Sequence, residues 1–170
     1  MVKNERQVFR HPIKLRFRGV YDMKGLMKLI YKWFNSNYYV YNETKYKDKI
    51  ETVFGNEIEI DMEGNKKVSE YYRYYVTVRT HQWESKDIMV KVGEKEVSMM
   101  QGRVEVQIEA KIVTDWQDKF EKGTMWEKAQ KFMEKVVIGA DIGLLHIDPL
   151  DKELHALSRE IKNHLKIESA

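Results

Sequence analysis

Strict alternation of apolar and polar side chains over long stretches is the feature that most constrains how this chain folds. Residues 103–116 read RVEVQIEAKIVTDW, in which Val104, Val106, Ile108, Ala110 and Ile112 are the apolar members. Successive side chains of an extended strand point to opposite faces, so this period predicts strands with one face in the core and the other in water. Residues 13–18, 56–62 and 83–92 repeat the pattern, and turn-forming residues at 63–65 and 93–96 favour an antiparallel meander.

Three segments instead carry the three- and four-residue spacing of an amphipathic helix. Asp22 is a candidate N-cap for a helix over residues 22–34, and Thr124 with Glu127 forms a capping box for a helix over 124–138. Asp148 followed by Pro149 predicts the start of a last helix at 149–166. The order strand, helix, about six strands, helix, helix is typical of an α+β fold.

These elements predict a single domain over residues 1–170. We expect a curved antiparallel sheet of about six or seven strands, with its apolar face packed on the long helix at 124–138. Residues 1–10 are expected to form a basic N-terminal arm, because residues 1–20 carry six lysines and arginines against one glutamate. The remaining 150 residues are close to neutral, so the whole-chain charge of +3 is concentrated at this end.

Residues 69–83, SEYYRYYVTVRTHQW, raise the question of what a strand does with so many aromatic and basic side chains. Parity assigns Tyr72, Tyr74, Val76 and Val78 to the core face. The other face then carries Tyr71, Arg73, Tyr75, Thr77, Arg79 and His81. Aromatic rings interleaved with arginine can stack nucleic-acid bases, but tyrosine is also a good strand former on which arginine packs. The acidic row at 57–61 would interrupt a basic field if it shares this face.

The sequence lacks the residues that several kinds of functional site require. There is no cysteine, which excludes disulfides, thiolate metal sites and cysteine nucleophiles. The histidines show no metal-ligand spacing, and Ser158 lacks the glycine context of a serine hydrolase. We therefore expect no catalytic residue, no metal site and no cofactor. The charged start and the lack of an apolar run of ~20 residues predict a cytoplasmic protein without a membrane span.

The last helix carries a regular apolar stripe, formed by Leu150, Leu154, Leu157, Ile161 and Leu165. Such a stripe near a terminus packs either on its own domain or on a second chain, and the spacing is compatible with both. The sequence therefore leaves open a protein partner or a homo-oligomer docked on this helix.

Two resemblances cover most of the chain. The succession GVYDMKGLMKLIYKWF, YYVYNETKY, KKVSEYYRYYVTVRT and GRVEVQIEAKIVTDW resembles a group of uncharacterised archaeal soluble proteins, which implies no activity. The order strand, helix, long meander, C-terminal helix is also similar to the helix-grip (START-like) fold. That resemblance implies an apolar ligand held between sheet and helix, although the extra helix at 149–166 departs from the pattern.

These observations predict a non-enzymatic binding or assembly module that engages a protein partner or an apolar small molecule between sheet and helix. The candidate ligand-binding residues are Tyr46, Tyr72, Tyr74, Trp126, Phe132 and Met133. The alternative is nucleic-acid binding through the basic arm and the exposed sheet face. Its candidate residues are Arg10, Arg16, Arg18, Tyr71, Arg73, Tyr75 and Arg79.

Overall fold

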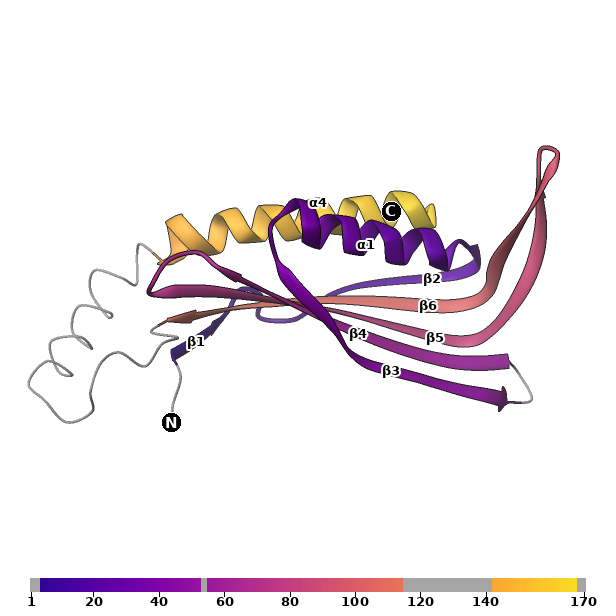
Figure 1. Cartoon of the computed structure of the whole chain (residues 1–170), viewed down its shortest axis with the longest axis horizontal. Helices are drawn as coiled ribbons and strands as arrows, with labels where there is room; N and C mark the ends of the chain where they lie inside the picture. The colour runs from indigo at the N-terminus through magenta and orange to yellow at the C-terminus, as the bar shows by residue number, and fades with distance from the viewer. Residues whose placement is uncertain (1–3, 53–54, 115–141, 168–170) are drawn as a thin grey trace, which may run out of the picture.

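One twisted antiparallel sheet forms the body of the protein (Figure 1). The computed structural model describes residues 4–52, 55–114 and 142–167. Within these residues the sheet has six strands in the order β1-β6-β5-β4-β3, and β2 pairs with β6 beside β1. The strands are β1 (Asn4–Gln7), β2 (Ile13–Tyr21), β3 (Val40–Thr52), β4 (Gly55–Lys67), β5 (Tyr72–Val92) and β6 (Lys95–Thr114). The expected α+β antiparallel sheet is thus confirmed, and the sheet is not closed into a barrel.

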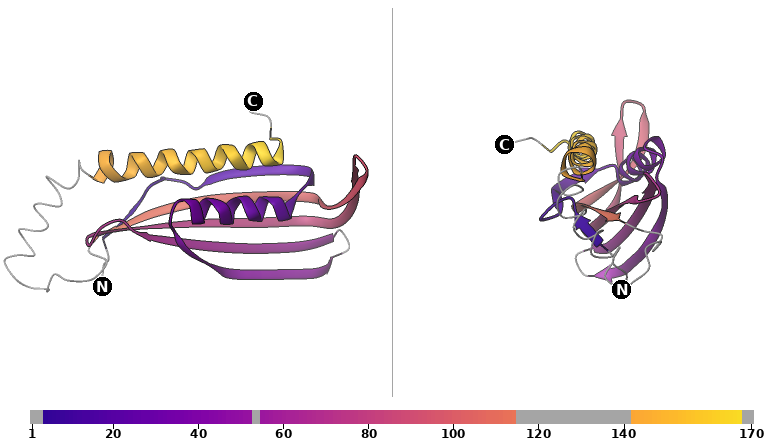
Figure 2. Two further views of the ribbon diagram at one scale, coloured as in Figure 1. Left: turned by 45° about the horizontal axis from the view of Figure 1, so that its top comes forward. Right: turned by 90° about the vertical axis from the view of Figure 1, so that its left-hand side faces the viewer.

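Two helices lie along the same face of this sheet, as Figures 1 and 2 show. Helix α1 (Met23–Ser36) begins at Asp22, whose carboxylate accepts a hydrogen bond of 2.8 Å from the Gly25 amide. Helix α4 (Asp148–Leu165) follows a short π-helical segment, η2 (Ile142–Ile147). The two helices meet where the His164 ring donates from Nε2 to the Asp22 carbonyl oxygen at 2.8 Å. The expected helix at 124–138 lies outside the described residues.

The apolar stripe of α4 is part of the chain's own core. Leu150, Leu154, Leu157, Ile161 and Leu165 are each at most 2% exposed and pack with the inward side chains of the sheet. These include Val76, Val78, Val106 and Ile108, all fully buried. The alternative in which this stripe packs on its own domain is therefore confirmed, because its side chains already have an internal partner.

The central strands follow the predicted parity. Tyr74, Val76 and Val78 face the helices, whereas Tyr75 and Arg79 lie on the opposite, helix-free face and are only half-buried. Residues 83–92 and 97–99 do not form separate strands. They continue β5 and β6 through an irregularity between Trp83 and Lys86. The merged strands are 21 and 20 residues long.

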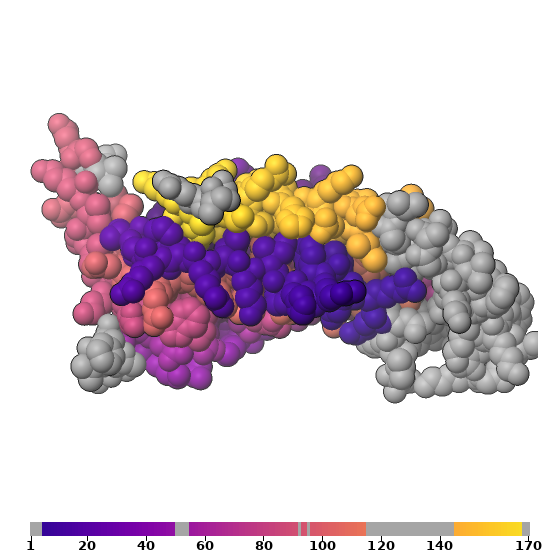
Figure 3. Space-filling model, turned by 180° about the vertical axis from the view of Figure 1, so that it is seen from behind, coloured from indigo at the N-terminus to yellow at the C-terminus, as the bar shows by residue number. Residues whose placement is uncertain are grey.

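The far ends of β5 and β6 leave the sheet. Pairing of β4 with β5 ends at Asn56–Ser85, and pairing of β2 with β6 ends at Tyr21–Met100. Among the described strands, residues 88–99 therefore pair only with each other, as a two-stranded ribbon that projects from one end of the molecule (Figures 1 and 3). We call this ribbon the arm.

Strand β3 does not keep one simple alternation along its whole length. Tyr41 pairs with Gly64 and Tyr46 pairs with Ile60, so both tyrosines face the helix side although their numbers differ in parity. The register shift between Glu43 and Lys45 inserts one residue and switches the faces. Val40, which has the same parity as Tyr46, therefore lies on the opposite face and is 74% exposed.

The predicted turn at 63–65 is also strand. Gly64 lies inside β4, where the Phe34 ring of α1 packs directly against the backbone. A glycine in a strand interior often marks such a close approach. The prediction of a turn here is wrong because it considered only the turn propensity of glycine.

The basic N-terminal segment is partly built into the sheet. Residues 4–7 form β1, and Glu5 pairs with Lys111 of β6 at 3.2 Å. No helix within the described residues is long and apolar enough to cross a membrane.

Candidate functional site

The helix-free face of the sheet is a ladder of ion pairs. Arg79 of β5 contacts Glu109 of β6 at 2.7 Å and Asp61 of β4 at 3.7 Å. On the outer strands, Lys45 pairs with Glu59, and Lys49 pairs with Glu57 at 2.7 Å. The acidic row thus lies among the basic side chains and neutralises the middle of the face.

This arrangement interrupts the central part of the predicted nucleic-acid surface with carboxylates. Tyr71, Arg73, Tyr75 and Arg79 all belong to β5 or its entrance, but they do not form a continuous basic field. Arg79 is held by two carboxylates, and the Tyr75 ring is approached by the Lys111 ammonium at 5.4 Å. Arg10 is exposed on the connection between β1 and β2.

Arg16 and Arg18 lie elsewhere, on the edge strand β2. The register sets Arg16 opposite Glu105 and Arg18 opposite Arg103, so two arginines are direct neighbours across the strands. Arg16 pairs with Glu105 through Nε, and Arg103 pairs with Glu84 at 2.9 Å. Among the described residues, no carboxylate is paired with Arg18.

These arginines border an open cleft of about 450 Å³. Besides them, Trp83 and Glu105 contribute to its wall. The Trp83 ring is stacked on the His81 ring at 3.8 Å, and the Arg103 guanidinium lies 5.8 Å from its centroid. We call this surface, formed by Arg16, Arg18, Trp83, Arg103 and Glu105, the arginine cleft.

Glu105 stays ionised in the arginine cleft despite its burial. The residue is only 7% exposed, and burial by itself opposes its ionisation. Hydrogen bonds from Arg16 and Gln107 outweigh this effect and hold the pKa of the carboxyl below its usual value. The cleft therefore contains one buried anion and three arginines, which leaves a net positive charge.

A second cluster, Glu57, Glu59 and His81, was missed by the sequence prediction of no metal site. Their potential ligand atoms lie within 4.8 Å of one another. The cluster exists because the β4–β5 register sets Glu59 opposite His81, a pairing across 22 positions that no local spacing reveals. His81 contacts Glu57 at 2.8 Å.

The two carboxylates of this cluster already have cationic partners. The hydrogen bond from Lys49 is the main cause of the lowered pKa of Glu57, and the hydrogen bond from Lys45 is the main cause of the lowered pKa of Glu59. A metal ion would have to displace both lysines. The geometry supports an ion-pair ladder at this point of the sheet.

Of the predicted ligand-binding residues that the structure describes, Tyr46 lies apart from Tyr72 and Tyr74. Tyr46 is 59% exposed and lines a pocket of about 190 Å³ with Met23 and Met100. Tyr72 and Tyr74 lie near the other end of the sheet. Tyr46 pairs with Ile60, and Ile60 pairs with Thr80 of β5. Thr80 is six residues from Tyr74 along β5, and six residues of strand span about 20 Å. Trp126, Phe132 and Met133 lie outside the described residues.

Tyr72 and Tyr74 instead contact η2. The Tyr74 hydroxyl is 2.7 Å from Nδ1 of His146, and the Tyr72 ring lies 4.1 Å from the His146 ring. Burial, followed by the negative charge of Glu153, raises the pKa of Tyr74 to about 12. Both tyrosines thus form part of the contact between the sheet and the segment that leads into α4.

Tyr39 belongs to the same polar region. Burial raises its pKa well above the ordinary value, and the charge of Glu153 adds to the effect. Within the described residues, neither the Tyr39 hydroxyl nor Oε2 of Glu153 has a hydrogen-bond partner. Tyrosines with raised pKa values stay protonated at neutral pH and do not act as bases there.

Comparison with protein-family models yields no match, and comparison with curated proteins yields none either.

Proposed function

We propose that the protein is a non-enzymatic assembly module whose arm docks on a protein partner, and that this partner is a second copy of the chain. The observation that carries the proposal is the pair of aliphatic cross-strand contacts on the arm. Ile88 is opposite Met99, and Val90 is opposite Val97. These four side chains share one face of the ribbon, because they are two residues apart along each strand.

Within the described residues this face is covered only in part: Ile88, Val90 and Met99 are half-buried, and Met99 also lines the small pocket at Tyr46. None of the four side chains is packed against the hydrophobic core, and Val97 is 37% exposed. A two-stranded ribbon is only marginally stable in water without a third strand or another packed element. Contact with a partner therefore supplies the support that the sheet and the helices do not give to residues 88–99.

A second copy fits because the arm does not repel itself. Within residues 88–99 the charged side chains are Lys91 and Lys95 against Glu94 and Glu96, two positive and two negative, so the net charge is zero. Two identical ribbons can bring their aliphatic faces together in a self-complementary contact.

An apolar small molecule is less well supported. The pocket at Tyr46, lined by sheet residues and by the start of α1, has a volume of about 190 Å³. Ligand pockets usually begin at roughly 300 Å³. The arm therefore offers the better binding surface.

Sedimentation velocity of the purified chain tests the proposal. We expect a dimer for the wild type and a monomer for Val90→Lys, which places a charge on the aliphatic face. Met89→Lys is the matched control, since Met89 lies on the other face of the same strand and is 62% exposed. A monomeric wild type, or equal dissociation in both variants, would refute docking of two copies through this face.

A further inference from the structure

The arginine cleft holds more positive charge than its own carboxylates compensate. Arg18 and Arg103 are directly opposite on neighbouring strands, and like charges in that position destabilise a sheet. Glu84 pairs with Arg103, and Glu105 pairs with Arg16. Arg18 has no such partner among the described residues. An anion placed between Arg18 and Arg103 would relieve their repulsion.

Arg16 also retains binding capacity. Its ion pair with Glu105 uses Nε, while 74% of its side chain remains exposed. A guanidinium group has five N–H donors in a planar fork, which suits the oxygens of phosphate. Arg16 can therefore hold Glu105 and still donate toward solvent.

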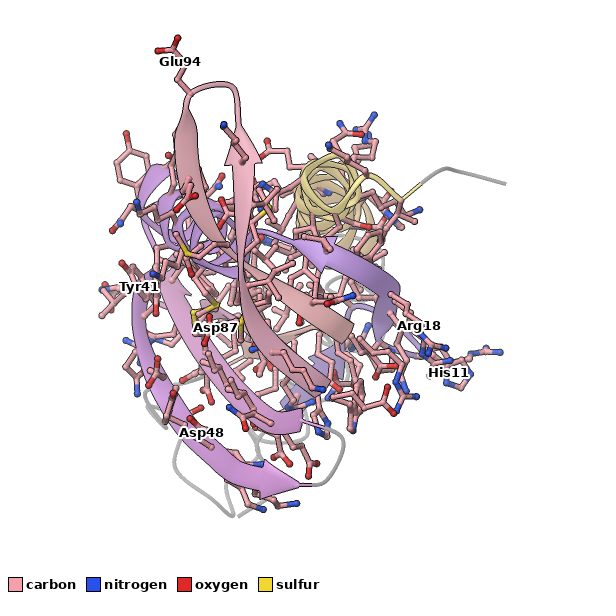
Figure 4. The ribbon with its side chains drawn as sticks, turned by 90° about the vertical axis from the view of Figure 1, so that its right-hand side faces the viewer. His11, Arg18, Tyr41, Asp48, Asp87 and Glu94 are labelled. Carbon is pink, nitrogen blue, oxygen red and sulfur yellow. The ribbon has the colours of Figure 1, made fainter. Side chains whose placement is uncertain are left out.

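The cationic side chains of β2 repeat along its free edge. Lys14, Arg16 and Arg18 alternate with Ile13, Leu15 and Phe17, so the three cations point to the helix-free side. Two residues of strand advance about 6.6 Å. Figure 4 shows Arg18 at the opposite edge of the sheet from Tyr41 and Asp48 of β3. Figure 3 shows the β2 side of the molecule beside α4.

We infer that this edge binds single-stranded nucleic acid, with one phosphate in the arginine cleft and the backbone running along β2 toward Lys14. A row of cations at a regular step fits a repeating anion better than a single phosphorylated head group. The Trp83 ring borders the same cleft and offers an aromatic edge to a base, while its stacking on His81 fixes its position. The inference is independent of the arm at residues 88–99, which takes no part in these contacts.

Fluorescence anisotropy with labelled oligodeoxythymidine and oligouridine tests the inference. We expect binding that weakens as salt is raised, because bound phosphates release counterions from the strand. Arg18→Ala should weaken binding at least about tenfold, in line with the loss of a charged hydrogen bond. It should also lower the salt slope by about 0.7, the value for one phosphate of a single strand.

Arg159→Ala is the matched control, because Arg159 is exposed on α4, on the helix side of the sheet. This variant should bind as the wild type does. Arg103→Ala is a second test from the other side of the cleft, and thermal melting followed by circular dichroism confirms that each variant is folded.

Four results would overturn the inference. The first is no salt-dependent binding of either oligonucleotide by the wild type. The second is an equal loss for Arg18→Ala and Arg159→Ala. The third is binding of phosphatidylserine vesicles without binding of oligonucleotides, which would assign the cleft to a lipid surface. The fourth is displacement of the oligonucleotide by the same concentration of inorganic phosphate in the wild type and in Arg18→Ala, which would mean that the cleft is not the phosphate site.

Discussion

The ring of Phe34 lies directly on Gly64. A Cβ atom built at residue 64 would stand 2.4 Å from Cε1 of that ring, far inside van der Waals contact. Phe34 is fully buried, and its ring also stacks on Tyr41 at 5.2 Å. This contact ties α1 to β4 and explains why a strand interior contains glycine.

Gly64→Ala should therefore destabilise the protein by roughly 1–3 kcal/mol through overpacking. Urea unfolding of Gly64→Ala, Phe34→Leu and the double variant gives the coupling between the two sites. We expect the double variant to be more stable than the sum of the single effects implies, since the smaller side chain makes room for the added methyl group. Strict additivity would contradict the direct contact.

Leu157→Ala on α4 should lower the free energy of unfolding by about 2–5 kcal/mol, because it opens a cavity in the core. Leu157 is fully buried, whereas Lys152 on the same helix is exposed. Lys152→Ala is the matched control and should change stability by no more than about 0.5 kcal/mol. Equal, small effects in both variants would mean that the stripe is not part of the core.

Stability should fall at alkaline pH because of Tyr74. Its pKa is raised to about 12 in the folded state, against 10.0 as the ordinary value. The neutral hydroxyl is thus favoured by folding, and this contribution is complete below pH ~10 and lost as the pH rises toward 12. Urea unfolding across this range should show a smaller decline in Tyr74→Phe than in the wild type. An unchanged decline would contradict the raised pKa.

Glu105 should contribute to stability at neutral pH and lose that contribution in acid. Its folded-state pKa lies below the ordinary value, so the stabilisation is present above the unfolded pKa and disappears as the pH falls through the folded pKa. Glu105→Gln should therefore reduce the dependence of unfolding free energy on pH between neutral and acid conditions. Arg16→Gln removes the main stabilising partner and should have an effect in the same direction.

The local pattern of the chain predicted much of the fold. Alternation from 103 to 112 identified the inward residues of β6, and the spacing of leucines in 149–166 identified the buried face of α4. Both predictions rest on geometry within one element, because the period of a strand or a helix is fixed by its own backbone.

The sequence-based predictions were wrong where the conformation of one element depends on contacts with a neighbouring element. The switch of faces in β3 comes from one inserted residue relative to β4, and the glycine at 64 is explained only by the ring of Phe34. Alternation also suggested that Ile88 and Val90 point into the core, whereas β5 carries them beyond the sheet into the arm.

The candidate sites are tertiary for the same reason. No spacing in the sequence connects Arg18 with Arg103, or Glu59 with His81; antiparallel register brings each pair together. The sequence by itself determined most of the strands and the two long helices of the described residues, and on most strands which side chains face inward. Only the tertiary structure decided strand register, the projection of the arm and the partners of each charge, because these depend on contacts between segments far apart in the chain.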